Sequence, residues 1–388
     1  MVIIGIDPHE RTHTASALQP GTNAVIATLK VDASLAGYRQ LMRWAAGFGQ
    51  RRWAVENARG LGRHLAPWLV ARGEKVEDVP SAATARIREL SRGGRRKNDV
   101  IDAAAAASAA ALGGEARPVA AEDLTTVLAL LNERRDNVTT QRTRLVNQLH
   151  ALLRDLIPGG GPADLTAAAA TRLLATVRAA GQAEAARKQL ARELAAEIRD
   201  ADQRLKALTA RIAATVTKHD TRLPTVDGIG PVIAGRLLGR TRQPSRFATT
   251  AAFASYAGVA PVEVASADHA RHRLPRSGDR QLNLALHQIA VTQIRMRASR
   301  GRACYDTKIA AGKTHNEAMR CLKRRLADHV WRIMIADERR ATAKASPAGH
   351  SGAALTSSAT GSTPTTSSSD KPLPGPADRQ PTTPRSAA

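Results

Sequence analysis

The chain has 388 residues and is strongly basic: 58 Lys and Arg outnumber 34 Asp and Glu, which gives a formal net charge of +24. Such an excess favours a polyanionic partner, and nucleic acid is the first expectation, with an Arg-rich composition bias as the alternative. No window reaches the apolar length that spans a bilayer, and no charged leader precedes an apolar segment, so we expect neither membrane insertion nor secretion. We therefore expect a cytoplasmic protein that associates with the nucleoid.

Cysteine and aromatic residues are scarce. The two cysteines, Cys304 and Cys321, form neither a disulfide framework nor the clustered spacing of a zinc site, so both are expected to be small core residues. Aromatic residues make up 3% of the chain, and the core must therefore consist mainly of Ala, Leu, Val and Ile. The length allows two or three domains.

The N-terminal segment predicts a mixed α/β domain. Apolar runs, turn residues and helical spacing predict strands at 2–7, 14–18, 24–31, 53–56 and 75–79 and helices at 35–46 and 61–70. Three meandering strands followed by alternating helices and strands are the order of the RNase-H-like fold. In that fold, acidic residues at the tips of the first and fourth strands and on the last helix meet at one edge.

Four acidic residues occupy those places. Asp7 closes the first predicted strand, Glu56 closes the fourth, and Asp99 and Asp102 open an Ala-rich helix. Residues three apart on a helix share one side. Oxygen-only ligands suit Mg²⁺ or Mn²⁺, which can hold a phosphodiester during in-line attack. Each acid taken singly also fits a surface charge, and Asp99 and Asp102 also fit a helix N-terminus.

A basic loop precedes the acidic helix. The run 92–97 contains Arg95, Arg96 and Lys97 beside the expected metal site. A solvated charge run is one interpretation, and phosphate contact is the other.

The middle of the chain is rich in helix formers from about Glu122 to Lys218, with breaks at 158–162 and near Gly181. In its second arm apolar positions repeat every seven residues, a period that favours a coiled coil within one chain or between two. These positions are Leu194, Ala201, Leu208 and Thr215, alternating with Ile198, Leu205 and Ile212. An intramolecular hairpin and a dimer or tetramer interface both fit this pattern.

A compact, mainly helical segment is expected from Leu223 to about Ala336. It opens with a turn whose Gly228 and Gly230 permit close backbone approach before a helix N-terminus, either as a DNA-backbone contact or as an ordinary turn between helices. Beyond it, the Ser-, Thr- and Pro-rich residues from about Thr342 to Ala388 are expected to be disordered.

Within this segment, a serine precedes a cluster of cations. Ser266 is followed by Arg271, Arg273 and Arg276, an arrangement that could present a nucleophile to a phosphate whose charge the arginines neutralise. From composition alone, a serine in a basic loop more often has no chemical role.

The chain resembles the DEDD-type insertion-sequence transposases related to the Piv DNA invertases. The residues that carry the resemblance are Ile3–Asp7, Val55–Asn57, Lys97–Asp102, Gly228–Pro231, Phe253, Tyr256–Gly258, Ala265–Ser266 and Arg280–Asn283. The similarity runs in the family's order from about Val2 to Ala336.

The resemblance implies a RuvC-like domain in which Asp7, Glu56, Asp99 and Asp102 bind Mg²⁺ or Mn²⁺. It also implies a coiled-coil dimerisation element, a catalytic serine, and a structured guide RNA that pairs with the DNA of the element ends and the target. The family's serine normally precedes glycine. Ser266 aligns best but is followed by Ala267, so Ser277, which precedes Gly278, is the second candidate.

The sequence therefore predicts an α/β domain followed by helical domains. The expected boundaries are 1–115 for the RuvC-like domain, 116–220 for the coiled coil, 221–340 for the serine transposase domain and 341–388 for the tail. The expected function is a DNA transposase that mobilises its own insertion sequence. A metal-dependent nuclease of the Holliday-junction resolvase kind and a non-catalytic nucleic-acid-binding protein are the alternatives.

Overall fold

A computed structural model describes residues 1–19, 21–90, 98–113, 116–266, 269–273 and 278–345, and gives the backbone alone for 262–266 and 269–273. The expected disordered tail lies almost entirely outside these residues. Two units divide the chain, Met1–Ala341 and Thr342–Ala388. The expected domain boundaries at 115 and 220, inside the first unit, stay predictions.

The N-terminal part contains a six-stranded sheet of order β3-β2-β1-β4-β5-β6. Its strands are β1 (Val2–Pro8), β2 (Thr12–Leu18), β3 (Val25–Asp32), β4 (Arg51–Glu56), β5 (Val76–Val79) and β6 (Arg117–Pro118). The first three form the antiparallel meander, and β1, β4 and β5 are parallel. The predicted mixed α/β sheet is thus confirmed. The short β6, which pairs antiparallel with β5, had no apolar run to predict it.

Helices cover both faces of this sheet. They are α1 (Leu35–Ala45), α2 (Leu65–Val70), α3 (Ser81–Leu90) and α4 (Asp99–Leu112), with short 3₁₀ turns at Ala46–Phe48 and Leu61–Arg63. Ile4 and Ile6 of β1 pack with α1 and α2 on one face, and Ile3 packs with α3 and α4 on the other. The central strands are therefore buried on both sides, as the long apolar run of β1 requires.

Helix α4 lies unusually close to the sheet. Gly5 of β1 is in contact with the helix backbone, since a Cβ built on it would lie 1.8 Å from the carbonyl oxygen of Ala103. The Ala-rich sequence of α4 lets the helix approach, because Ala103, Ala106 and Ala107 are buried with no side chain beyond Cβ. This close contact fixes the first turn of α4 relative to β1.

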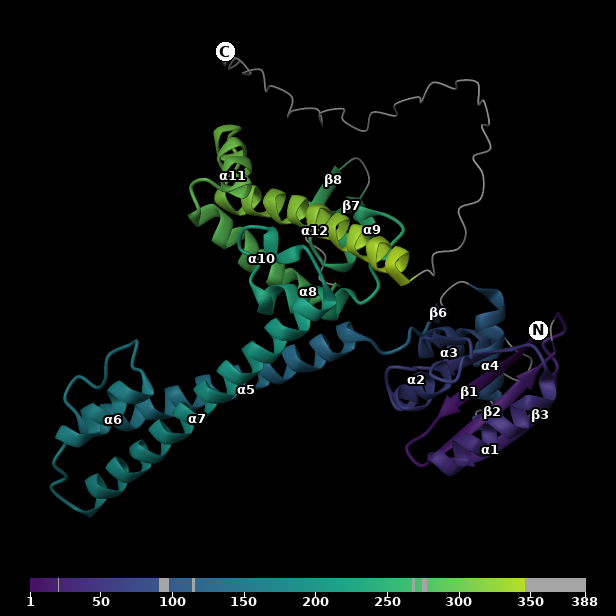
Figure 1. Cartoon of the computed structure of the whole chain (residues 1–388), viewed down its shortest axis with the longest axis horizontal. Helices are drawn as coiled ribbons and strands as arrows, with labels where there is room; N and C mark the ends of the chain where they lie inside the picture. Colours follow the sequence, from purple (N-terminus) through teal and green to yellow (C-terminus); the bar gives the residue numbers. More distant parts are fainter. Residues whose placement is uncertain (20, 91–97, 114–115, 267–268, 274–277, 346–388) are drawn as a thin grey trace, which may run out of the picture. The chain divides into compact units, whose positions relative to one another are not determined.

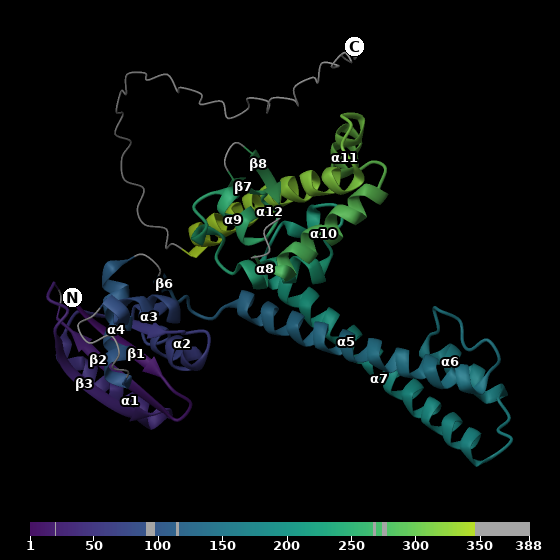
Figure 2. The same ribbon diagram turned by 180° about the vertical axis from the view of Figure 1, so that it is seen from behind.

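The middle part is a long helical hairpin, drawn in blue and teal in Figure 1, and the view from behind in Figure 2 also shows α5 and α7 side by side. It consists of α5 (Leu124–Leu156), α6 (Ala167–Thr176) and α7 (Gln182–His219), and Gly181 caps the start of α7. The seven-residue seam of α7 packs within the chain: Ile198 shares a cluster with Leu145, Leu149 and Leu153 of α5. The structure thus supplies an intramolecular partner for the seam.

The remaining part is mainly helical. Its elements are two 3₁₀ turns (Leu223–Thr225 and Pro244–Arg246), α8 (Pro231–Thr241), α9 (Thr250–Tyr256), β7 (Val262–Ser266), β8 (His269–Arg273), α10 (Arg280–Arg295), α11 (Arg300–Ala310) and α12 (His315–Ala345). Helix α12 continues past the expected end near Ala336. Leu128 of α5 and Ile212 of α7 pack in the same core as Phe253 and Leu286, so the near ends of the hairpin are built into this part.

The cysteines and the apolar character of the helices were also predicted from the sequence. Cys304 and Cys321 are both free and half-buried, and Cys304 packs against the edge of the core. None of the helices in the described part of the chain combines the length and the apolar character that a bilayer crossing requires.

Candidate functional site

The four acidic residues come together at the carboxyl edge of the parallel strands. Asp7 is near the end of β1 and Glu56 ends β4, and the parallel register Ile6 to Val55 brings these two strand ends to the same edge. Asp99 and Asp102 occupy the first turn of α4. The tight contact of Gly5 with α4 holds that turn against β1.

Helix α4 begins where it does because Asn98 caps it. The Asn98 side-chain oxygen accepts a hydrogen bond from the backbone N–H of Ile101 at 2.8 Å. Asp99 is therefore the first helical residue and is half-buried, whereas Asp102, one turn later, is 6% exposed. One carboxylate of the helix is available to solvent and the other lies against the sheet.

Burial and neighbouring acids both raise the pKa values of Asp7 and Glu56. Burial raises the pKa of Asp7, and the charges of Asp102 and Asp99 raise it further, although His9 opposes them. Burial also raises the pKa of Glu56, and the charges of Asp7 and Asp102 raise it further. A hydrogen bond with Ser81 and the charge of Arg88 lower it. Carboxylates gathered in this way favour a bound cation, because each one disfavours ionisation of the next.

Three cationic or titratable side chains that belong to no predicted site contact the acids. Lys30 Nζ of β3 lies 2.9 Å from Asp99 Oδ2, and hydrogen bonding to this ammonium lowers the pKa of Asp99. Arg88 of α3 donates to Asp102 Oδ1 at 2.6 Å. His9 follows Asp7 by two residues, a weak local signal, whereas Lys30 and Arg88 have no sequence signal at all.

The donors at this edge suit a divalent cation. One carboxylate oxygen each from Asp7 and Asp99 and one ring nitrogen of His9 lie within 4.8 Å of one another. Oxygen donors from Asp and Glu are the ligands that Mg²⁺ and Mn²⁺ accept. The charge of Asp102 raises the pKa of Asp7, and the charges of Asp7 and Asp102 raise that of Glu56, so the other two acids lie near this group. The residues present therefore fit a divalent metal site.

The predicted nucleophile lies on a β-hairpin whose two ends, near Gly258 and Gly278, are packed against each other. Ser266 is the last residue of β7 and pairs with His269 of β8, beside residues 267–268, which are outside the described part. Arg271 and Arg273 of β8 pair with Val264 and Val262. Arg276 and Ser277 lie outside the described residues, as do Arg95, Arg96 and Lys97.

The base of this hairpin is tightly packed. The backbone N–H of Asp279 donates to the carbonyl of Tyr256 at 2.7 Å, and a Cβ on Gly278 would lie 2.9 Å from the Cα of Gly258. Asn283 of α10 donates to the carbonyl of Gly258 at 2.7 Å and accepts from Lys323 at 2.5 Å. The segment that carries Ser266 thus leaves and re-enters the helical core at one point. Burial lowers the pKa of Lys323.

The Gly228–Gly230 turn is also in the described part. Gly228 has φ +80, a conformation that favours glycine, and a Cβ there would lie 3.2 Å from the Cβ of Thr292, a tight contact. Gly230 caps the N-terminus of α8, is exposed, and has open space around it. The turn thus packs against α10 at Gly228 and is exposed to solvent at Gly230.

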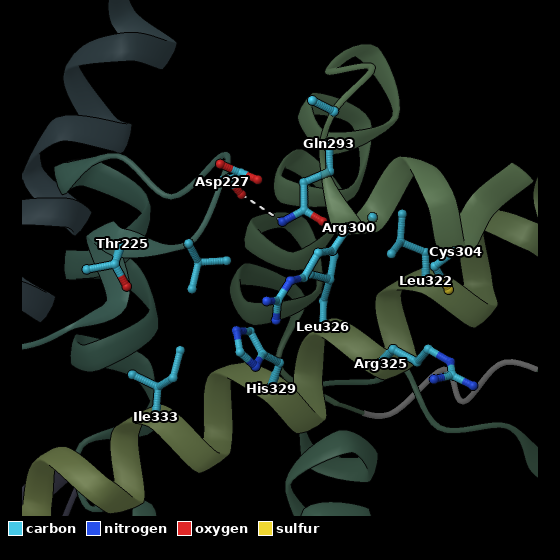
Figure 3. A pocket seen from close by; sticks show the side chains of 13 residues that line it. Thr225, Asp227, Gln293, Arg300, Cys304, Leu322, Arg325, Leu326, His329 and Ile333 are labelled. Atoms are coloured by element: carbon cyan, nitrogen blue, oxygen red, sulfur yellow. Dashed lines mark hydrogen bonds between the residues drawn. The ribbon is translucent and has the colours of Figure 1, made fainter.

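A cavity of about 680 Å³ adjoins this turn, between the 3₁₀ turn at Leu223–Thr225 and helices α10, α11 and α12. Among the described residues that line it, the charged side chains and the imidazole are those of Asp227, Arg300, Arg325 and His329. In the view of Figure 3 the side chains of Arg300 and His329 point toward the middle of the cavity, and that of Arg325 points away. Gln293 also lines the cavity and donates to the Asp227 carbonyl at 2.8 Å.

Comparisons with known proteins match most of the chain. A family model described as a transposase, of the DEDD IS110 type, matches residues 4–158, and one described as the transposase IS116/IS110/IS902 family matches residues 220–306. The chain is 27% identical over 382 residues to the insertion element IS116 uncharacterized 44.8 kDa protein of Streptomyces clavuligerus. This alignment covers 87% of this chain and 95% of that protein. It is likewise 27% identical over 385 residues to the insertion element IS110 uncharacterized 43.6 kDa protein of Streptomyces coelicolor, covering 83% and 91%.

Among solved structures, the Thermus thermophilus RuvC structure aligns with 19% identity and a TM-score of 0.25, over 31% of this chain and 100% of that one. The two family models lie on the two parts that carry the acids and the serine hairpin. The predicted membership of the DEDD-type insertion-sequence transposases is thereby confirmed. The chain belongs to the IS116/IS110/IS902 family of transposases.

Proposed function

We propose that this transposase cuts and rejoins DNA with Mg²⁺ or Mn²⁺ held by Asp7, Glu56, Asp99 and Asp102 and with Ser266 as the nucleophile. The observation that carries the proposal is the convergence of the four carboxylates at one edge of the sheet, where the pKa values of Asp7 and Glu56 are raised by burial and by their acidic neighbours. A bound cation would neutralise charge on a DNA phosphate and orient it for in-line attack.

The residues of the chain have separate tasks in this scheme. Arg88 and Lys30 orient Asp102 and Asp99 through charged hydrogen bonds, and the close contact of Gly5 with α4 sets the spacing between Asp7 and the helix. The Ser266 oxygen would form a bond to phosphorus while the bond from phosphorus to one sugar oxygen breaks. The serine loses its proton and the leaving oxygen takes one up, so that one phosphate ester replaces another and is conserved for rejoining. The role of Ser266 rests on the family resemblance and on its place at the tip of a hairpin whose two ends pack against each other.

Nucleic-acid contacts would come from several basic segments. The candidates are Arg95, Arg96, Lys97, Arg271, Arg273 and Arg276 with the Gly228–Gly230 turn, and the cavity beside that turn adds Arg300 and His329. The Arg and Lys side chains among them complement the phosphates of the element ends and of the target. On the family resemblance alone, we extend the proposal to a structured guide RNA. We also extend it to a homo-oligomer, whose interface would use a surface other than the α7 seam because that seam packs on α5.

The test of the metal site compares binding with cleavage. Asp7→Ala and Asp102→Ala should abolish metal-dependent strand cleavage while nucleic-acid binding stays within a few-fold, because these ligands hold the cation and not the polyanion. Glu10→Ala, an exposed acid of the same β1–β2 turn, is the matched control and should cleave like the wild type. Cleavage by both site variants at the wild-type rate would refute the assignment.

The test of the serine uses a nicked DNA substrate that stalls the reaction. A protein–DNA adduct should survive denaturation and map to Ser266, and Ser266→Ala should remove it without loss of binding. Ser277→Ala is run in parallel and should retain the adduct. An adduct on Ser277 would transfer the role to that residue. Metal-dependent cleavage without an adduct would instead indicate the nuclease in which water attacks, and binding without cleavage would indicate the non-catalytic protein.

A further inference from the structure

A histidine that belongs to no predicted site lies between two of the acids. His9 follows β1, and its Nε2 lies 3.1 Å from Asp7 Oδ2 and 3.3 Å from Asp99 Oδ1. The side chain is 47% exposed, so a dissolved ion can reach it. Its backbone is fixed, because the N–H of His9 donates to the carbonyl of Thr12 at 2.9 Å and closes the turn between β1 and β2. The imidazole is thus carried on an ordered hairpin.

These distances match those between neighbouring ligands of one metal ion. With metal–ligand bonds of about 2.0–2.2 Å, adjacent ligand atoms lie roughly 3.0 Å apart in octahedral and roughly 3.4 Å apart in tetrahedral geometry. The two distances from the His9 nitrogen fall within that interval, and the three donor atoms lie within 4.8 Å of one another. One cation can therefore contact all three donors after little rearrangement.

We propose that His9 is a nitrogen ligand of the catalytic metal, beside Asp7 and Asp99, and that it shifts the preference of the site from Mg²⁺ toward Mn²⁺. The inference rests on the metal site of the proposed function. Mg²⁺ favours oxygen ligands, whereas first-row transition metals accept imidazole nitrogen together with carboxylates. The competing role is a positive charge that bridges Asp7 and Asp99 and is not bound to the metal.

The experiment uses pulsed electron paramagnetic resonance of Mn²⁺ bound to the full-length chain, because a coordinated imidazole gives a ¹⁴N modulation that an ion pair does not. The wild type should show this modulation. His9→Ala and His9→Arg should lose it, and His9→Arg places a positive charge between Asp7 and Asp99 that cannot bind a metal ion. His64→Ala is the matched control, since His64 is an exposed histidine of the same domain that contacts Tyr38, and it should keep the signal.

Affinity supplies the second measurement. Loss of an outer-shell partner already weakens metal binding about 10–100-fold, so His9→Ala and His9→Arg should weaken Mn²⁺ binding at least about tenfold and weaken Mg²⁺ binding less. Far-ultraviolet circular dichroism should be unchanged in all variants.

The outcomes separate the two proposals. Wild-type chain that binds Mn²⁺ without ¹⁴N modulation, or modulation that persists in His9→Ala, would overturn the role of His9 and leave the acidic metal site standing. Equal losses of Mn²⁺ and Mg²⁺ affinity would overturn the shift in preference. Wild-type chain that binds no Mn²⁺ would overturn this inference together with the metal site of the proposed function.

Discussion

Replacement of Gly5 by alanine should separate the two elements that carry the acids. Gly5 lies on β1 two residues before Asp7, and the added Cβ would lie 1.8 Å from the Ala103 carbonyl oxygen and 2.8 Å from the Ala107 nitrogen of α4. Non-bonded heavy atoms need a separation of roughly 3.5 Å, so the strand and the helix must move apart by more than about 1 Å. Both contacts are backbone atoms, which cannot rotate away as a side chain can.

The displacement has two measurable consequences. Overpacking of a filled core costs about 1–3 kcal/mol or more, so the free energy of unfolding should fall by at least that amount. A shift of about 1 Å between catalytic groups can reduce the rate about 10²-fold, and here it separates Asp7 from Asp99 and Asp102. We therefore expect Gly5→Ala to lose Mn²⁺ affinity and cleavage even under conditions where it remains folded.

The assay combines urea unfolding of the purified chain with Mn²⁺ titration and strand cleavage. Gly47→Ala is the matched control, because a Cβ on this exposed glycine of the same domain meets nothing within 4 Å. Its free energy of unfolding should change by no more than about 0.5 kcal/mol, and its cleavage rate should be unchanged. If Gly5→Ala were as stable and active as Gly47→Ala, the close approach of α4 to β1 would not be what positions the acids.

Three further predictions concern charge, packing and binding. Asp7→Asn should stabilise the metal-free chain at neutral pH. Burial raises the pKa of Asp7, so the wild type loses stability as the pH rises from the unfolded pKa of about 3.9 through the folded pKa. Denaturant titrations across pH should show that the stability gained by the variant vanishes below the unfolded pKa. Ile212→Ala should lower the free energy of unfolding by about 2–5 kcal/mol without changing the particle mass in light scattering, since Ile212 is fully buried within the chain. DNA affinity should fall steeply with salt, and truncation after Ala345, the end of α12, should leave that slope and the melting temperature unchanged. A flat salt dependence would contradict the charge argument, and aggregation of the truncated chain would contradict the boundary.

Local sequence patterns were sufficient for much of the fold. The apolar run of β1 and the turn residues between β2 and β3 predicted the meander, and the Ala-rich stretch after Asn98 predicted α4. The ends were less accurate: β4 begins at Arg51, two residues early, because its first pair is with Val2. The expected helix at 61–70 consists of a 3₁₀ turn followed by α2.

The α7 seam illustrates a limit of periodicity. A seven-residue repeat specifies an apolar stripe but not what covers it. In the structure the stripe meets α5, because the break after Leu156 returns the chain along its own path. The choice between an intramolecular hairpin and a dimer therefore depends on the connection between the helices, which the repeat does not encode.

Short-range sequence patterns place each of the four acids at a strand end or a helix start. The side chains that surround the acids come from distant parts of the chain and follow from the packing of the fold. His9, Lys30 and Arg88 reach the carboxylates from a turn, a strand edge and a neighbouring helix. Such contacts depend on how closely α4 packs on the sheet, and that distance follows from three-dimensional packing at Gly5, which no periodicity along the chain records.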